Sequence, residues 1–147
     1  MKVYIAAPLF SAGEKAFNLR TDEIIRSCGH DTYLPQRDGG VIAELPDTVN
    51  GVGKYEYVFG LDCRNLAETD IFLYVFDGRV PDEGASFALG YCYALGKRCI
   101  GYKTDCRTSF DGLDNVMISC APERVLRSED ELRDFFKELK KHESTHS

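Results

Sequence analysis

Three acidic residues follow the most strand-like segment of the sequence. Asp77, Asp82 and Glu83 crowd one short loop, and Gly84 follows where the backbone must approach something closely or begin a helix tightly. Carboxylates in such a loop could act on a bound ligand. They could equally cap a helix, because negative charge stabilises a helix start. The loop alone leaves both explanations open.

Alternating strands and helices would position this loop. Short apolar runs predict strands at 2–7, 32–35, 70–76, 98–102 and 123–127. Helical spacing predicts helices at 12–28, 55–66 and 83–96, a short helix or turn at 113–120, and a final amphipathic helix capped by Ser128. Residues 36–50 are expected to form a loop, and residues 142–147 a frayed tail.

Strands that alternate with helices favour a parallel sheet with right-handed crossovers. We therefore predict an α/β fold, a doubly wound, flavodoxin-like or Rossmann-like sandwich of about five strands, with residues 1–147 as a single domain. Ligands bind such sheets outside the carboxyl ends of the strands. The loops expected to form the site are 7–11, 35–40, 77–84 and 104–117.

Composition restricts the ligand. The chain has 147 residues, a net charge of −6 and a pI of about 5.1. This charge argues against a nucleic-acid partner, because phosphate binding needs clustered Lys and Arg. A small ligand or a protein partner is expected instead.

The cysteines and the N-terminus indicate the compartment. The six cysteines are scattered with no CxxC pair, which favours buried free thiols over a disulfide framework or a metal site. The N-terminus enters a strand without a signal-peptide pattern, and no apolar run approaches the roughly 20 residues that cross a bilayer. A cytoplasmic location away from the membrane is expected.

Three segments resemble the nucleoside 2-deoxyribosyltransferase family across most of the chain. They are KVYIAAPLFS at the start, FDGRVPDEGASFALGYCYALGKRCIGY in the middle, and DNVMIS. The family signature has a strand ending in a Gly/Ala/Ser-Pro-x-Phe-like turn, then an Asp-x-Gly-x-x-x-Glu-x-Gly helix start, then Asn-x-Met. Their joint occurrence in this order, at matching distances, is more specific than any one of them.

The resemblance implies an activity, the transfer of a 2′-deoxyribosyl group between nucleobases. In the family, a glutamate attacks C1′ of a 2′-deoxynucleoside, the base leaves with proton assistance, and a second base attacks the deoxyribosyl-enzyme ester. The logic parallels that of retaining glycosidases. The partners implied are a 2′-deoxynucleoside and a free nucleobase, and no metal or organic cofactor is expected.

Site residues follow from the same resemblance. It implies that Asp62 and Asp82 hold the deoxyribose hydroxyls or act near the base, and that Tyr4 lies beside the nucleophile. Taken alone, Asp62 could be a solvated helix residue and Tyr4 ordinary core. Asn115 matches an asparagine that reaches the sugar from a neighbouring subunit, which implies a homo-oligomer, and Phe10 would supply an apolar wall for the base. The other substrate-binding residues implied are Pro8, Asp38, Gly39, Asp77, Gly84 and Met117.

One position departs from the signature. Aligned on Asp82 and Gly84, the nucleophilic glutamate falls on Ala88. A methyl group cannot attack C1′, so the chain is expected to be inactive or severely impaired while its pocket still binds substrate. Three explanations for Ala88 are open: an engineered variant, a natural inactive homologue or a different nucleophile. The otherwise intact signature favours the engineered variant. Glu83 is the obvious substitute, but it lies about 140° around the helix and should face elsewhere.

Specificity and the exact reaction stay open. Residues 35–39 resemble a purine-type Pro-x-x-Asp-Gly loop, although Arg37 and Asp38 could equally form a solvated turn. A second hypothesis is an N-glycosidase that hydrolyses deoxynucleoside 5′-monophosphates; its phosphate site would have only Ser11 and Arg20 as candidates. A third is a non-catalytic nucleoside-binding module on the same scaffold.

Overall fold

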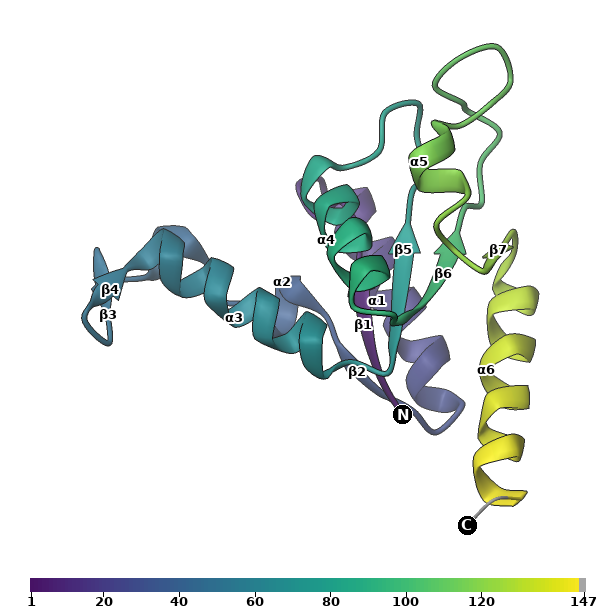
Figure 1. Cartoon of the computed structure of the whole chain (residues 1–147), viewed down its shortest axis with the longest axis horizontal. Coiled ribbons are helices and arrows are strands. Elements are labelled where there is room, and N and C mark those ends of the chain that lie inside the picture. The colour runs from purple at the N-terminus through teal and green to yellow at the C-terminus, as the bar shows by residue number, and fades with distance from the viewer. Residues whose placement is uncertain (146–147) are drawn as a thin grey trace.

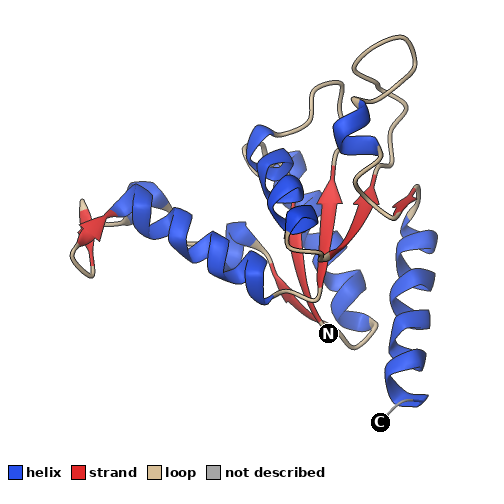
Figure 2. Cartoon of the chain, in the orientation of Figure 1, coloured by secondary structure: helices blue, strands red, loops and turns tan. Residues whose placement is uncertain are grey.

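A five-stranded parallel sheet forms the centre of the computed structural model, which describes residues 1–145 (Figures 1 and 2). In sheet order the strands are β2 (Asp31–Tyr33), β1 (Lys2–Ala6), β5 (Ile71–Val75), β6 (Arg98–Tyr102) and β7 (Arg124–Leu126). The α-helices are α1 (Ala12–Ser27), α2 (Pro35–Asp38), α3 (Lys54–Glu68), α4 (Glu83–Ala94), α5 (Val116–Ser119) and α6 (Glu129–Thr145). The predicted doubly wound α/β fold is confirmed.

Helices cover both faces of the sheet, because its central strands are apolar on both sides. In β1, Val3 and Ile5 pack in one core with residues of α1 and α6. Tyr4 and Ala6 point to the opposite face and pack with residues of α3 and α4. All strand pairs of this five-stranded sheet are parallel, so the carboxyl ends of β1 and β5 meet at one edge of the sheet.

Helix α3 is the exception to this close packing. Figure 1 shows it running away from the sheet, with a small hairpin of β3 (Thr48–Val49) and β4 (Val52–Gly53) at its outer end. Leu66 is its one buried residue, whereas Tyr55 and Phe59 are exposed. The inner part of α3 therefore covers the sheet, and the outer part leaves aromatic side chains in solvent.

The segment 36–50 contains more regular structure than expected. It includes most of α2, a 3-10 turn at Ile42–Glu44, and β3 of the hairpin. The hairpin turns at Asn50 and Gly51, which both have positive φ angles of 53° and 82°. An Asn-Gly pair between apolar residues favours such a turn, because both residues tolerate left-handed backbone.

Helix α6 begins as predicted and ends later. The hydroxyl of Ser128 accepts a hydrogen bond from the Glu131 N–H at 3.2 Å, as an N-cap does. The helix continues to Thr145, so the part of the expected frayed tail at 142–145 is helical here. The rest of that tail lies outside the described residues.

The six cysteines are all free thiols. Cys28, Cys92 and Cys99 are buried as expected, whereas Cys106 and Cys120 are exposed and Cys63 is half-buried. The expectation of buried thiols was therefore wrong for the last three, because they lie on loops and on the outward α3.

Lys103 ties together the loops that follow β5 and β6. Its ammonium group is buried and donates to the carbonyl oxygens of Phe76 and Gly78, each at 3.3 Å, and to the Asp114 carboxylate at 3.1 Å. A buried ammonium group needs such partners, since an unpaired buried charge is costly. Lys103 thus fixes the segment that carries Asn115.

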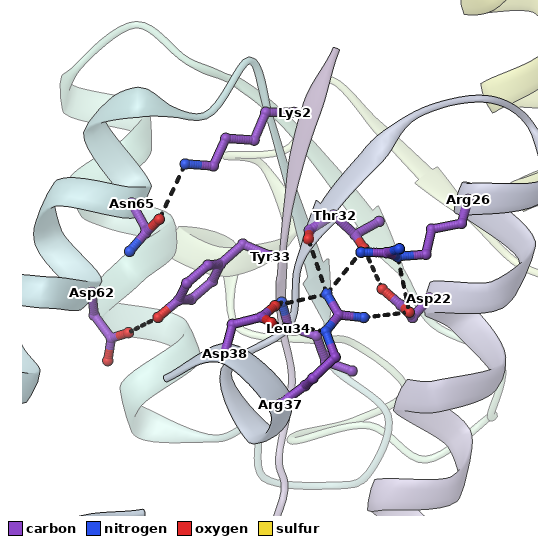
Figure 3. A network of polar contacts seen from close by, with 10 residues as sticks. All are labelled: Lys2, Asp22, Arg26, Thr32, Tyr33, Leu34, Arg37, Asp38, Asp62 and Asn65. Atoms are coloured by element: carbon purple, nitrogen blue, oxygen red, sulfur yellow. Dashed lines mark hydrogen bonds and ion pairs between the residues drawn. The ribbon is translucent and has the colours of Figure 1, made fainter. Parts of the chain in front are cut away.

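A buried ionic network joins α1, β2 and α2 (Figure 3). Asp22 is buried; it accepts a hydrogen bond from the Thr32 hydroxyl and pairs with Arg26 at 3.4 Å and Arg37 at 2.7 Å. Arg37 also pairs with Asp38 at 2.7 Å. The network holds α2 against the rest of the domain.

Replacement of Arg37 tests the contribution of this network. We expect Arg37→Ala to lower the free energy of unfolding by about 1–3 kcal/mol, because the buried Asp22 carboxylate loses its shortest ion pair. Denaturant unfolding measures the change. Arg64→Ala removes an exposed arginine and should stay within about 0.5 kcal/mol. Equal losses in the two variants would contradict a structural role for Arg37.

Candidate active site

A cavity of about 250 Å³ lies between α3 and α4, beside the carboxyl end of β1. This is the position where ligands bind doubly wound sheets. Its lining residues are Tyr4, Ala6, Ala7, Leu9, Pro35, Phe59, Asp62, Cys63, Leu66, Asp82, Gly84, Ala85, Phe87 and Ala88. The four residues predicted as catalytic, Tyr4, Asp62, Asp82 and Ala88, are all among them.

Ala88 lies on the face of α4 that packs toward the sheet. The buried positions of this helix are Ala85, Ala88, Leu89 and Cys92, which follow helical spacing. Ala88 is only 7% exposed and still borders the cavity. Gly84 and Ala85 line the same wall, so short side chains leave space beside this helix.

Asp62 reaches the cavity from α3 and is held by two tyrosines. Its Oδ1 accepts hydrogen bonds from the hydroxyls of Tyr4 and Tyr33, each at 3.3 Å, and its Oδ2 has no hydrogen-bond partner within residues 1–145 (Figure 3 shows the Tyr33 contact). Burial raises the pKa of Asp62, and the two hydroxyls oppose that rise. One carboxylate oxygen is therefore fixed and the other is available to a ligand.

The two tyrosines stay protonated in this arrangement. Burial raises the pKa of Tyr4 and of Tyr33, and the negative charge of Asp62 raises both further. Tyr33 was not predicted as a site residue. Its place at the site depends on the β1–β2 register, which pairs Tyr33 with Tyr4 and stacks their rings at 5.0 Å.

Asp82 fits both explanations left open by the sequence, a helix cap and a residue that faces a ligand site. It is the N-cap of α4, where its Oδ2 accepts a hydrogen bond from the Ala85 N–H at 2.8 Å, and it also lines the cavity. Ser86 donates to the Asp82 carbonyl at 2.8 Å and contacts the Tyr74 hydroxyl at 2.9 Å. Glu83 is exposed and is not among the lining residues, as its helical position predicts.

Two aromatic residues other than Phe10 line the cavity. Phe10 is 79% exposed and lies outside the cavity lining, whereas Phe59 and Phe87 line the cavity and are 59% and 57% exposed. Their ring centroids lie 6.1 Å apart with the planes tilted by 51°. These rings, from α3 and α4, form an open aromatic border to the cavity.

The other predicted substrate-binding residues, apart from Gly84, lie outside the lining and make structural contacts. Asp77 accepts hydrogen bonds from the backbone N–H and the hydroxyl of Thr104, at 2.5 and 2.6 Å. Pro8 accepts one from the Asn18 amide at 2.9 Å. Asn115 is the N-cap of α5 and accepts one from the backbone N–H of Met117, which is exposed.

The purine-type loop is also held by its own contacts. Asp38 accepts a hydrogen bond from the Leu34 N–H at 2.8 Å. Although burial opposes it, this bond and the Arg37 guanidinium keep the pKa of Asp38 below its usual range. The Gly39 N–H donates to the Pro35 carbonyl at 2.8 Å, and a Cβ at Gly39 would lie 2.7 Å from that oxygen. Pro35 alone brings this loop to the cavity.

The phosphate-site candidates are engaged elsewhere. The Ser11 hydroxyl caps α1 by accepting from the Glu14 N–H, and Arg20 pairs with Glu129 at 3.0 Å. Within residues 1–145, no group of three or more His, Cys, Asp or Glu side chains could hold a metal ion. The helices of that part of the chain are too short or too polar for a membrane span.

The burial of Asp62 predicts a dependence of stability on pH. The pKa of Asp62 is higher in the folded protein than in the unfolded chain. The folded protein therefore loses stability as the pH rises from the unfolded-state pKa through the folded-state pKa. We expect Asp62→Asn to raise Tm at pH 7 but not at pH 3, where the carboxyl is already neutral. Thermal unfolding measures this. Asp134→Asn, at an exposed position of α6, should leave Tm nearly unchanged, and a lower Tm for Asp62→Asn at pH 7 would contradict the account.

Comparisons with known proteins agree with this fold. Curated protein sequences give no match. Among solved structures, the chain is similar to a 2-deoxyribosyltransferase from Bacillus psychrosaccharolyticus (21% identity, 91% of each chain, TM-score 0.74). It is also similar to a conserved protein from Enterococcus faecalis V583 (22% identity, 94% of this chain and 98% of that chain, TM-score 0.76). A third similar structure is a 2-desoxiribosyltransferase from Leishmania mexicana (20% identity, 93% of this chain and 97% of that chain, TM-score 0.66). These likenesses show the fold. A family model for nucleoside 2-deoxyribosyltransferase matches residues 3–117, and the chain therefore belongs to the nucleoside 2-deoxyribosyltransferase family.

Proposed function

We propose that the cavity binds a 2′-deoxynucleoside, and that the chain with a glutamate at position 88 transfers the deoxyribosyl group between purine bases through a covalent ester. One observation carries this proposal. Ala88 borders the same cavity as Tyr4, Asp62 and Asp82, at the position that the family signature gives to its nucleophile. A carboxylate there would attack C1′ of a sugar held by the two aspartates.

Polar and apolar groups are divided as a nucleoside requires. The free Oδ2 of Asp62 and the Oδ1 of Asp82 can accept hydrogen bonds from sugar hydroxyls. The rings of Phe59 and Phe87 offer faces to a base, and such stacking contributes about 1–3 kcal/mol. In this proposal the sugar lies against α4 and the base lies toward the aromatic border.

The chain with Ala88 binds substrate but transfers poorly. Loss of a covalent nucleophile removes the ester intermediate without removing the contacts that bind sugar and base. The intact Asp62, Asp82 and Tyr4 support retained binding. Purine preference rests on the resemblance of the loop 35–39, of which Pro35 reaches the cavity.

Restoring the carboxylate tests the proposed function. We expect Ala88→Glu to increase base exchange between 2′-deoxyadenosine and free hypoxanthine by about a thousandfold or more, because the ester can then form. Chromatography of the nucleoside products measures exchange. Ala88→Gln has nearly the same shape without a nucleophile and should stay at the level of Ala88.

The outcome has clear alternatives. No exchange by a folded Ala88→Glu protein that still binds deoxynucleoside would favour the non-catalytic binding module. Efficient exchange with thymidine as donor would contradict the purine preference and leave the proposed transfer reaction unaffected. Cleavage of 2′-deoxyadenosine monophosphate in preference to the nucleoside would favour the nucleotide hydrolase.

We also propose that Asn115 completes the site of a neighbouring subunit. Asn115 is exposed and lies outside the cavity of its own chain. Exposed apolar side chains surround it in sequence, namely Phe110, Leu113, Val116 and Met117. An apolar surface of this kind is typical of protein interfaces.

Mixed oligomers test this placement. The double variant Ala88→Glu/Asn115→Ala should show little exchange alone, because its glutamate lacks the partner's asparagine. Mixing it with the Ala88 chain, itself deficient, should restore activity, since each Ala88 subunit donates Asn115 to a glutamate-bearing neighbour. Exchange rates before and after subunit mixing, with the oligomer size from sedimentation, measure this. Full activity of the double variant alone, or no gain on mixing, would contradict the proposal.

A further inference from the structure

We propose that the chain as it stands, with Ala88, cleaves the glycosidic bond of a bound 2′-deoxynucleoside by a single displacement, in which water takes the place of the missing carboxylate. This inference rests on the proposed binding of a deoxynucleoside in the cavity. It adds a different reaction, hydrolysis with inversion at C1′, to the transfer with retention proposed for the glutamate-bearing form.

The space for a small nucleophile lies along α4. Gly84, Ala85 and Ala88 line this wall of the cavity, and none has a side chain longer than a methyl group. The larger Phe87 lies at the exposed border instead. A water molecule occupies about 30 Å³, a small part of the cavity of about 250 Å³ that Ala88 borders.

Asp62 can remove a proton from that water. Its Oδ1 is held by two tyrosine hydroxyls, Oδ2 has no hydrogen-bond partner within residues 1–145, and Asp62 lines the same cavity that Ala88 borders. Burial also raises the pKa of this carboxyl, which makes its ionised form a stronger base than an exposed aspartate. The other lining carboxylate, Asp82, is partly committed to the cap of α4.

The reaction balances without a cofactor. The water oxygen forms a bond to C1′ as the bond from C1′ to the base nitrogen breaks, and that electron pair leaves with the base. One water proton passes to the Asp62 carboxylate, which later releases it to solvent, and the departing base on the opposite face of the sugar takes a proton from solvent. The products are the free base and 2-deoxyribose, and a β-nucleoside gives the α-anomer because one displacement inverts the centre.

Azide provides a sharp probe, because it is a small nucleophile that needs no deprotonation. With azide, a nitrogen of the anion forms the bond to C1′, and the base leaves and takes a proton from solvent. We expect the Ala88 chain to convert 2′-deoxyadenosine and sodium azide to α-2-deoxyribosyl azide, identified by NMR. Release of adenine should rise by about tenfold or more, because azide is a stronger nucleophile than water.

Two variants separate the roles. Ala88→Leu fills the space beside α4 and should abolish the azide product while the protein still melts cooperatively. Asp62→Asn should slow the reaction with water by about 100-fold relative to that with azide, because only water needs a base. Comparing the two reactions within one variant cancels any loss of substrate binding.

The outcomes distinguish this inference from the proposed function. Formation of β-azide, or an equal azide response in Ala88→Leu, would overturn the single displacement beside Ala88. Absence of the azide product, together with base exchange by Ala88→Glu, would overturn this inference and leave the proposed function standing. Absence of both reactions and of nucleoside binding by calorimetry would remove both.

Discussion

A carboxylate that is withdrawn from water must find its hydrogen bonds within the protein, and this requirement organises the site around Asp62. Two tyrosine hydroxyls, from β1 and β2, donate to one of its oxygens. The contact fixes α3 against the two strands at the point where the helix leaves the sheet. Together with the buried Leu66 of α3, this contact positions Asp62 and Phe59 relative to α4. The geometry of the cavity therefore depends on a polar contact as much as on the apolar core.

The opposite wall depends on small residues and on one cap. Asp82 starts α4 at the edge where β1 and β5 end, so the first turns of the helix face the cavity. Ala85 and Ala88 pack against the sheet and keep that wall short. A glutamate at position 88 would add a third carboxylate to the lining of the cavity, beside those of Asp62 and Asp82. Its like charge and its burial would cost stability, as catalytic carboxylates commonly do.

The sequence predicted the framework well and the outer contacts less well. Apolar runs and helical spacing located the sheet and four long helices, because burial on both faces leaves a strong pattern in the residues of β1 and β5. The family resemblance predicted that Tyr4, Asp62, Asp82 and Ala88 share one site, and all four line the cavity. Tyr33 and the hairpin at Asn50 were missed. The Asn-Gly turn is a local signal that a loop-rich segment obscured, whereas Tyr33 reaches the site through pairing of β1 with β2, strands that are far apart in the sequence.

Side-chain direction was the part that the sequence could not determine. Phe10 follows the turn after β1 but points into solvent, whereas Phe59 and Phe87 reach the cavity because α3 and α4 happen to converge there. Asp77 and Asp38 are chemically suited to a ligand, yet nearby backbone N–H groups occupy them. Such competition between local backbone and ligand is decided by distances of a few ångströms, which residue type does not specify.

A crystal structure of the chain with bound 2′-deoxyadenosine, collected before turnover, tests the central claim most directly. The account predicts that C1′ lies in contact with the Cβ of Ala88, at about 4 Å, with the sugar hydroxyls at Asp62 and Asp82 and the base beside Phe59 and Phe87. A nucleoside bound at another surface, or one whose base rather than its sugar lies against Ala88, would contradict it.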